Sequence, residues 1–373
     1  MFIKATAEQY KQLKDKWEEI TRTLEEINEK PLRFLRYFIM SQYESEITLV
    51  DKSKPPREDT IYNWFKNHEE DCGYDKKPLE FVNLLIESAK IYAQYVTGKD
   101  MNGNENRYLD NIKHLSGVAR QHFILLLAGK HLQKDLFTEL CKQIENLFFC
   151  YIITREPTKT FEVKFTKWAD ELRKIKSEEE LSEFIEKNIY KEIEDKAVGF
   201  EFALQNLNED DIQQYRIKYI LAKLTQFINE EGFGTQPAYA KLENYINKEI
   251  DIEHILPETP TAELLAEFDN NKEEYNEYMH RLGNLTLLEK TINASIQRDS
   301  YPEKAKAYKK STFLLVRSIP ELVSIGTNTR VERVMTKLRS YEKWDKESIK
   351  DRQQLLTELA KEVWNIKRGP PKD

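Results

Sequence analysis

The run LFTELCKQIENLFFCYII, residues 136–153, decides the fold class. Its apolar side chains cover one broad face at helical spacing, which is typical of the central helix of a helical array. Segments of helical length with the same spacing surround it, separated by polar or glycine-bearing breaks. We expect further helices over residues 5–29, 32–43, 60–67, 79–96, 108–115, 119–132, 161–175, 178–193, 197–207, 213–229 and 238–248.

From residue 249 the pattern changes. IDIEHILP and NLTLLE are short apolar runs that predict two strands, and the Lys-rich stretch 291–310 predicts a helix after them. The 373 residues contain only 11 Gly and 12 Pro, which indicates a mainly α protein. We expect an α-helical domain over 1–245, a small strand–strand–helix domain over 246–330, and a C-terminal helical extension over 331–373 that packs back on the body.

Composition limits the classes of function. A net charge of -7 argues against a uniformly basic surface, so any contact with nucleic acid needs a local patch. The three cysteines, Cys72, Cys141 and Cys150, lack CxxC spacing, which favours buried reduced thiols over a disulfide or zinc site. No apolar run reaches membrane-spanning length, and the N-terminus lacks the core of a signal peptide. We therefore expect a cytoplasmic protein.

Glu253 and His254 stand at the end of the first expected strand, just before Pro257. Sites are usually built where a strand passes into a loop. Alone, the pair is a weak signal, because a single histidine is more often a surface or hydrogen-bonded residue. The second expected strand strengthens the signal, because it carries Asn284 in RLGNLTLL and is followed by Asn293.

These four positions resemble the HNH (His-Me finger) nuclease pattern. In that family a ββα unit presents an acid–His pair on the first strand, a structural Asn on the second, and a His or Asn on the helix. More narrowly, IEHILP, RLGNLTLL and the series Tyr301, Lys304, Tyr308 and Ser311 resemble the C-terminal nuclease domain of GmrSD-type, modification-dependent restriction endonucleases. A looser likeness covers KPLRFLRYFIMSQY and the terminal positions Trp344, Ile349 and Arg352.

The resemblance implies a role for each residue. His254 is the general base that takes a proton from the attacking water, and an imidazole suits this work near neutral pH. Glu253 and Asn293 hold one divalent cation, Mg²⁺ or Mn²⁺, through oxygen atoms. Asn284 fixes the loop behind His254 without touching substrate. The family commonly has Asp and His where this chain has Glu253 and Asn293, and both changes favour an oxygen-preferring metal over zinc.

Two features have more than one interpretation. His280 precedes the second strand and is a candidate ligand for phosphate or water, whereas the alternative is a capping or surface residue. The insertion 261–279 between the strands is expected to be helical, and it is either a DNA-contacting lid or padding.

Local charge supports DNA as substrate. The stretch from residue 290 to 318 contains seven basic residues and two acidic ones. Such a patch would position a phosphate backbone without reading bases, and the alternative is a solvated lysine-rich helix. The candidate DNA-binding residues are Lys290, Arg298, Lys304, Lys306, Lys309 and Lys310.

The sequence therefore predicts a DNA endonuclease or nickase of restriction or anti-phage defence. GmrSD-type proteins generally add an NTP-using sensor domain with a DGQQR-like motif, which does not occur in these residues. We expect the sensor as a separate subunit or as another part of a longer protein. The competing hypotheses are a non-cutting helical adaptor that keeps the finger fold, and a nuclease for RNA or branched substrates.

Overall fold

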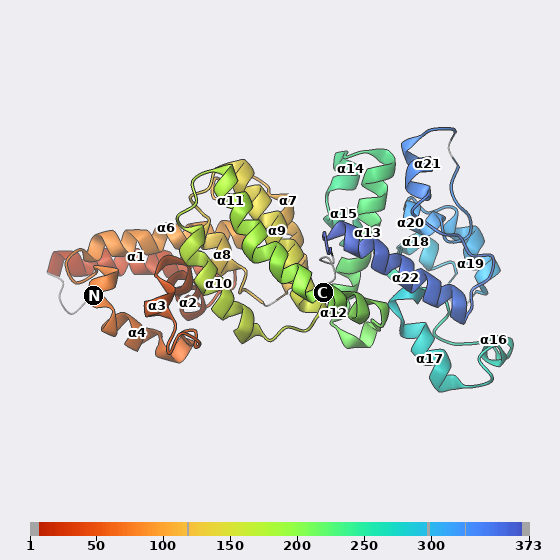
Figure 1. Ribbon diagram of the computed structural model, residues 1–373, viewed down its shortest axis with the longest axis horizontal. Helices are drawn as coiled ribbons and strands as arrows, with labels where there is room; N and C mark the ends of the chain where they lie inside the picture. The colour runs from red at the N-terminus through yellow and green to blue at the C-terminus, as the bar shows by residue number, and fades with distance from the viewer. Residues whose placement is uncertain (1–6, 118, 297–298, 325, 368–373) are drawn as a thin grey trace, which may run out of the picture. The chain divides into compact units, whose positions relative to one another are not determined.

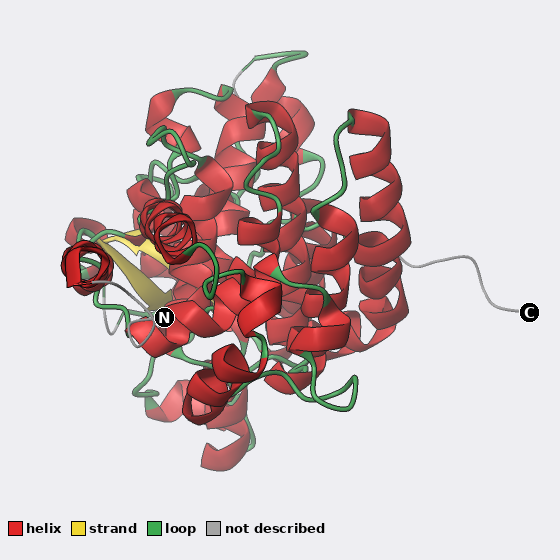
Figure 2. Ribbon diagram, turned by 90° about the vertical axis from the view of Figure 1, so that its left-hand side faces the viewer, coloured by secondary structure: helices red, strands yellow, loops and turns green. Residues whose placement is uncertain are grey.

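The computed structural model describes residues 7–117, 119–296, 299–324 and 326–367, and two compact units divide the chain between Ile193 and Glu194. Both units are mainly helical, and the described residues contain one two-stranded sheet (Figure 2). The prediction of a mainly α protein is confirmed. The division comes earlier in the chain than the boundary expected at residue 245, because the helix Gln214–Phe233 packs on the second strand and on the C-terminal helices.

The first unit is a helical array (Figure 1). Its long helix α9 is buried over most of its length, with Leu140, Ile144 and Leu147 wholly inaccessible to solvent. Helix α7 packs on α9, α1 packs on α6, and α8 packs on both α2 and α10. The helices are α1 (Ala7–Glu25), α2 (Pro31–Gln42), α3 (Ser45–Thr48), α4 (Ile61–Asn67), α5 (Glu69–Cys72), α6 (Pro78–Val96), α7 (Arg107–Ser116), α8 (Phe123–Ala128), α9 (Lys134–Ile153), α10 (Thr158–Leu172) and α11 (Glu178–Phe184), with the short 3-10 turn η2 (Glu58–Thr60) before α4.

One continuous helical segment crosses the boundary between the units. Helix α11 passes into a π-helical turn, η3 (Ile185–Tyr190), and then into α12 (Lys191–Gln205) without a break. The sequence pattern predicted two separate helices here. They merge because the residues between them, Glu194 to Lys196, include neither Gly nor Pro.

The second unit is built around the sheet. Strands β1 (Ile250–His254) and β2 (Leu285–Glu289) pair antiparallel, with His254 opposite Leu285. Helix α18 contacts both strands, and α13 packs on β2. The other elements are η4 (Glu209–Asp211), α13 (Gln214–Phe233), α14 (Pro237–Ala240), α15 (Glu243–Ile246), α16 (Ala262–Ala266), α17 (Lys272–His280), η5 (Leu282–Asn284), α18 (Lys290–Asn293), α19 (Tyr301–Tyr308), α20 (Leu314–Arg317), α21 (Arg330–Met335) and α22 (Lys346–Val363).

Two predicted helices of this unit are shorter than expected. The stretch 238–248 forms α14 and α15, because Lys241 between them has an extended backbone. The Lys-rich stretch 291–310 forms α18 and α19, and Asn293 is the last residue of α18. The insertion between the strands is helical, in α16 and α17. The C-terminal α22 packs on α13 and η5.

The cysteines and the helices agree with the composition. Cys72, Cys141 and Cys150 are free thiols, and the latter two are buried. Burial raises the pKa of the Cys72 thiol to about 11, so it is not a reactive thiolate. None of the helices in the described ranges combines the length and apolar character that a bilayer span needs.

Candidate active site

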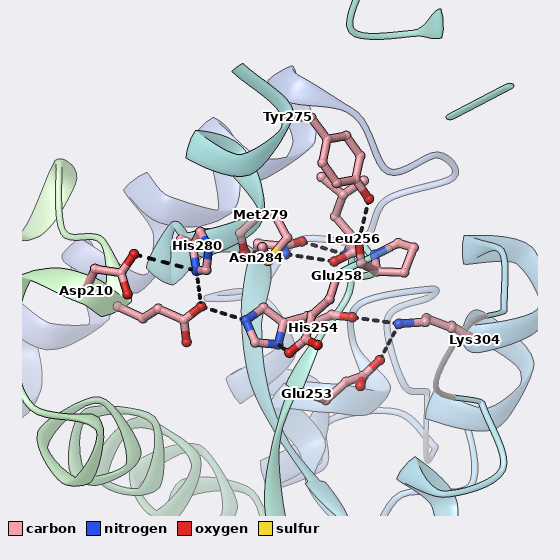
Figure 3. A network of polar contacts seen from close by, with 12 residues as sticks. Asp210, Glu253, His254, Leu256, Glu258, Tyr275, Met279, His280, Asn284 and Lys304 are labelled. Carbon is pink, nitrogen blue, oxygen red and sulfur yellow. Dashed lines mark hydrogen bonds and ion pairs between the residues drawn. The ribbon is translucent and has the colours of Figure 1, made fainter. Parts of the chain in front are cut away.

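The end of β1 sends two neighbouring side chains in different directions. Successive residues of a strand point to opposite faces. Figure 3 shows Glu253 directed toward Lys304, whereas the ring of His254 is directed toward His280. The acid and the histidine of the sequence motif therefore have different surroundings.

His254 belongs to a cluster with one acid and a second histidine. Oε1 of Glu209 lies 2.7 Å from Nε2 of His254 and 2.5 Å from Nδ1 of His280. On the other edge of the His254 ring, Nδ1 lies 3.5 Å from a carboxylate oxygen of Glu258, whose side chain is 74% exposed. Among the described residues, Glu209, His254 and His280 are the one group of His, Cys, Asp or Glu side chains whose ligand atoms gather closely, all within 4.8 Å of one another.

A short 3-10 turn brings Glu209 to the histidines. The turn η4 follows α12, and Asn208 caps it by accepting a hydrogen bond from the amide of Asp210. Asn208 also forms an isolated bridge with Arg281, and the amide of Leu282 donates to the carbonyl of Leu207 at 3.1 Å. These backbone contacts fix the start of η4 beside the end of α17, where His280 is the last residue.

The cluster is acidic and accessible. Burial raises the pKa of Glu209, but the hydrogen bonds and charges of His254 and His280 outweigh this effect and bring its pKa below the usual value. Asp210 lies 3.9 Å from His280 as a further carboxylate. The side chains of His254 and His280 are 15% and 31% exposed, so solvent and small ions reach them.

Asn284 holds the backbone on both sides of this cluster. Its side chain is fully buried. Its Oδ1 accepts a hydrogen bond from the amide of Leu256 at 2.7 Å, and its Nδ2 donates to the carbonyls of Leu256 at 3.2 Å and Met279 at 2.8 Å. Leu256 lies two residues after His254, and Met279 directly precedes His280. One amide thus links the two segments that carry the histidines.

The terminal motif supports Asn284 from behind. The indole of Trp344 donates to Oδ1 of Asn284 at 2.8 Å, and the buried Arg352 donates to the carbonyl of Gly283 at 2.7 Å. Burial lowers the pKa of Arg352 to about 10. A Cβ atom at Gly283 would collide with the carbonyl oxygen of Ile349, so a glycine is needed for α22 to approach this closely.

Glu253 takes part in a buried ion pair. Its Oε1 accepts hydrogen bonds from Nζ of Lys304 at 2.7 Å and from the hydroxyl of Tyr308 at 2.9 Å. Lys304 also donates to the carbonyl of His254 at 2.6 Å. Burial and the nearby Glu253 charge raise the pKa of Tyr308 well above its usual value, so its hydroxyl stays protonated. Because the Lys304 side chain is 0% exposed, the prediction that it contacts DNA is wrong for this structure.

We expect Lys304→Met to destabilise the second unit by about 3–5 kcal/mol, because it leaves the Glu253 carboxylate buried without its cation. The double variant Glu253→Gln with Lys304→Met should recover much of this loss. Urea unfolding followed by circular dichroism measures both effects. Lys306→Met is the matched control, since Lys306 is exposed and pairs with Glu303 on the same helix. Normal stability of Lys304→Met combined with weaker DNA binding would contradict the assignment.

Asn293 lies apart from this ion pair. In the described residues no hydrogen bond or ion pair joins it to Glu253. Its side-chain Oδ1 is buried and has no hydrogen-bond partner within the described ranges. An oxygen atom without a partner is suited to binding a metal ion. The Glu253 carboxylate, by contrast, is already paired with the ammonium group of Lys304. The role of both residues as metal ligands stays a prediction.

The other candidate DNA-binding residues are mostly at the surface. Lys290 and Lys310 are exposed, and so are Lys306 and Lys309, which pair with Glu303 and Glu321 respectively. Arg298 lies outside the described residues. Lys310 has no ion pair within the described part of the chain, so it is available to a phosphate.

Sequence reasoning missed Glu209. The residue lies 45 positions before His254 in the chain, within the polar run NLNEDD that was not assigned to any site. An acidic run in a turn between two helices is a common surface feature, and no motif marks one of its members. Asn208 followed by three acids is typical of a capped helical turn. The pattern does not indicate which of the three acidic side chains contacts the histidines.

The family match among the comparisons with known proteins falls within the second unit. Residues 194–359 match the model of a family described as GmrSD restriction endonucleases, C-terminal domain. A search of curated proteins found no match. The matched range begins at the first residue of the second unit and includes the whole Glu209, His254 and His280 cluster. Residues 194–359 are therefore similar to the C-terminal domain of GmrSD restriction endonucleases.

Proposed function

We propose that the second unit hydrolyses phosphodiester bonds in DNA with His254 as general base and with the help of a divalent metal ion. The observation that carries the proposal is the position of His254: it lies in an accessible His–Glu cluster inside the range that matches a restriction endonuclease family. The biological role would be restriction of foreign DNA, including modified phage DNA.

The contacts of His254 select the nitrogen that accepts the proton. Nε2 faces Glu209 and donates to its carboxylate, which leaves Nδ1, beside the exposed Glu258, as the basic atom. Nδ1 takes a proton from water as the water oxygen bonds to phosphorus and the bond from phosphorus to the 3′ oxygen breaks. Asn284 keeps His254 in place, because its amide fixes the following loop. A bound divalent ion would stabilise negative charge on the phosphate and on the leaving oxygen.

Exposed lysines supply the contact with the DNA backbone. Lys290 and Lys310 lie at the surface of the same unit, together with Lys306 and Lys309. Phosphate contacts of this kind position DNA without reading its sequence. Selection of the target would then depend on a sensor domain or subunit of the NTP-using type, which we propose as the partner.

Plasmid cleavage tests the proposal. The purified chain with Mg²⁺ or Mn²⁺ should nick or linearise supercoiled plasmid, and EDTA should stop the reaction. Phage DNA with modified bases, RNA and branched DNA are run in parallel to identify the substrate class. If no DNA is cut under any of these conditions while the protein binds it, the non-cutting adaptor is the better interpretation.

A further inference from the structure

We propose that Glu209 and His280 bind the divalent cation of this site, so that the metal lies on the Nε2 side of His254 and not at Glu253 and Asn293. Oε1 of Glu209 and Nδ1 of His280 lie 2.5 Å apart in a hydrogen bond, so a bound ion would replace the hydrogen between them and separate the two atoms slightly. Glu209 lies outside the acid–His–Asn motif of the hairpin and comes from the turn η4. The inference deepens the proposed function by giving its metal a position and a ligand class.

The charge around His254 requires a cation if DNA is to approach. Glu209, Asp210 and Glu258 all have carboxylate oxygens within 4.0 Å of a ring nitrogen of His254 or His280. Three carboxylates at the place where a phosphodiester must bind would repel it. In the described residues no lysine or arginine forms an ion pair with any of the three. A divalent ion bound by Glu209 and His280 would offset this charge and offer its remaining positions to water and phosphate.

The alternative acid is engaged elsewhere. Lys304 already neutralises Glu253, and both side chains are almost fully buried. A divalent ion at Glu253 would have to stand beside this buried ammonium group and would be repelled by it. The side chain of Glu209, by contrast, is 15% exposed, and its partners are two imidazole rings and no lysine or arginine of the described residues.

The donor set also indicates the kind of ion. One carboxylate oxygen and one imidazole nitrogen suit a first-row transition ion such as Mn²⁺ or Co²⁺ better than Mg²⁺, which prefers oxygen alone. His254 keeps its hydrogen bond to Glu209 and so orients this ligand without binding the metal itself, while its Nδ1 remains the base. The cluster then divides its work between metal binding and proton transfer.

Metal binding by the full chain tests the inference independently of cleavage. Mn²⁺ is titrated into the protein, and the free ion is counted by electron paramagnetic resonance, with the Co²⁺ absorption spectrum as a second readout. Glu209→Gln and His280→Ala should each weaken Mn²⁺ binding by about 100-fold or more. This effect is larger than the loss expected when only a hydrogen-bond partner of a ligand is removed. His254→Ala should weaken it about tenfold. Asn293→Ala should bind like the wild type, and circular dichroism checks that each variant is folded.

Three results would overturn the inference: no saturable Mn²⁺ site in the wild-type chain, wild-type binding by Glu209→Gln and His280→Ala, or a loss of binding in Asn293→Ala equal to theirs. A loss in His254→Ala as large as in Glu209→Gln would overturn the division of roles. The proposed function fails in a different way, because a protein that binds Mn²⁺ at this site and leaves every DNA intact is a metal protein but not a nuclease.

Discussion

The variant His254→Ala is expected to cut supercoiled plasmid about 10²–10⁴-fold more slowly than the wild type, which is the contribution that a positioned general base makes. The ring lies between Glu209 and Glu258, and alanine removes the imidazole nitrogen that accepts the proton. The carboxylate of Glu258 remains nearby, but a carboxylate is a weaker base than an imidazole. Single-turnover cleavage measures the change, and the loss should be in the rate constant, with DNA affinity altered little.

Two controls separate a catalytic role from a structural one. His68→Ala removes a histidine of the first unit that lies outside the Glu209, His254 and His280 cluster, and it should leave cleavage unchanged. Added imidazole should restore part of the activity of His254→Gly, because the small molecule can occupy the vacated space and accept the proton. Full activity of His254→Ala would show that another group activates the water. An equal loss of DNA binding would mean that His254 mainly holds substrate.

Much of the fold could be predicted because its local signals are strong. The broad apolar face of residues 136–153 gave α9, and the change to short apolar runs after residue 249 gave the two strands. The compact units divide between Ile193 and Glu194, earlier than the boundary expected at residue 245, because composition changes at the hairpin whereas packing changes at α12 and α13. Long helices look alike in sequence whether they pack toward one unit or the next, so the boundary depends on tertiary contacts.

The site was predicted in part for similar reasons. His254 and Asn284 belong to one sequence motif, and the structure brings their segments together. Glu209 comes from a separate turn, so no local pattern connects it to His254. The separation of Glu253 from His254 could be predicted from the strand itself, because neighbouring residues on a strand point to opposite faces. Whether an acid meets a lysine or a metal on its face depends on the packing of α19.

The buried amide of Asn284 leads to the second large prediction. Asn284→Ala removes four hydrogen bonds at once, two accepted by Oδ1 and two donated by Nδ2. It leaves the amide of Leu256 and the indole of Trp344 buried without acceptors. We expect the second unit to lose about 3–5 kcal/mol of stability, since each buried group without a partner costs about 1–3 kcal/mol. Urea unfolding measures the loss.

Hydrogen exchange shows where this loss acts. The Leu256 amide, which donates to Asn284 in the wild type, should exchange faster in Asn284→Ala, and cleavage should fall because the loop no longer fixes His254. Asn206→Ala is the matched control: its side chain is exposed and makes one bond to its own helix, so stability should change by less than about 0.5 kcal/mol. Slow exchange at Leu256 together with lost cleavage would contradict a positioning role, and would instead place Asn284 in direct contact with the substrate.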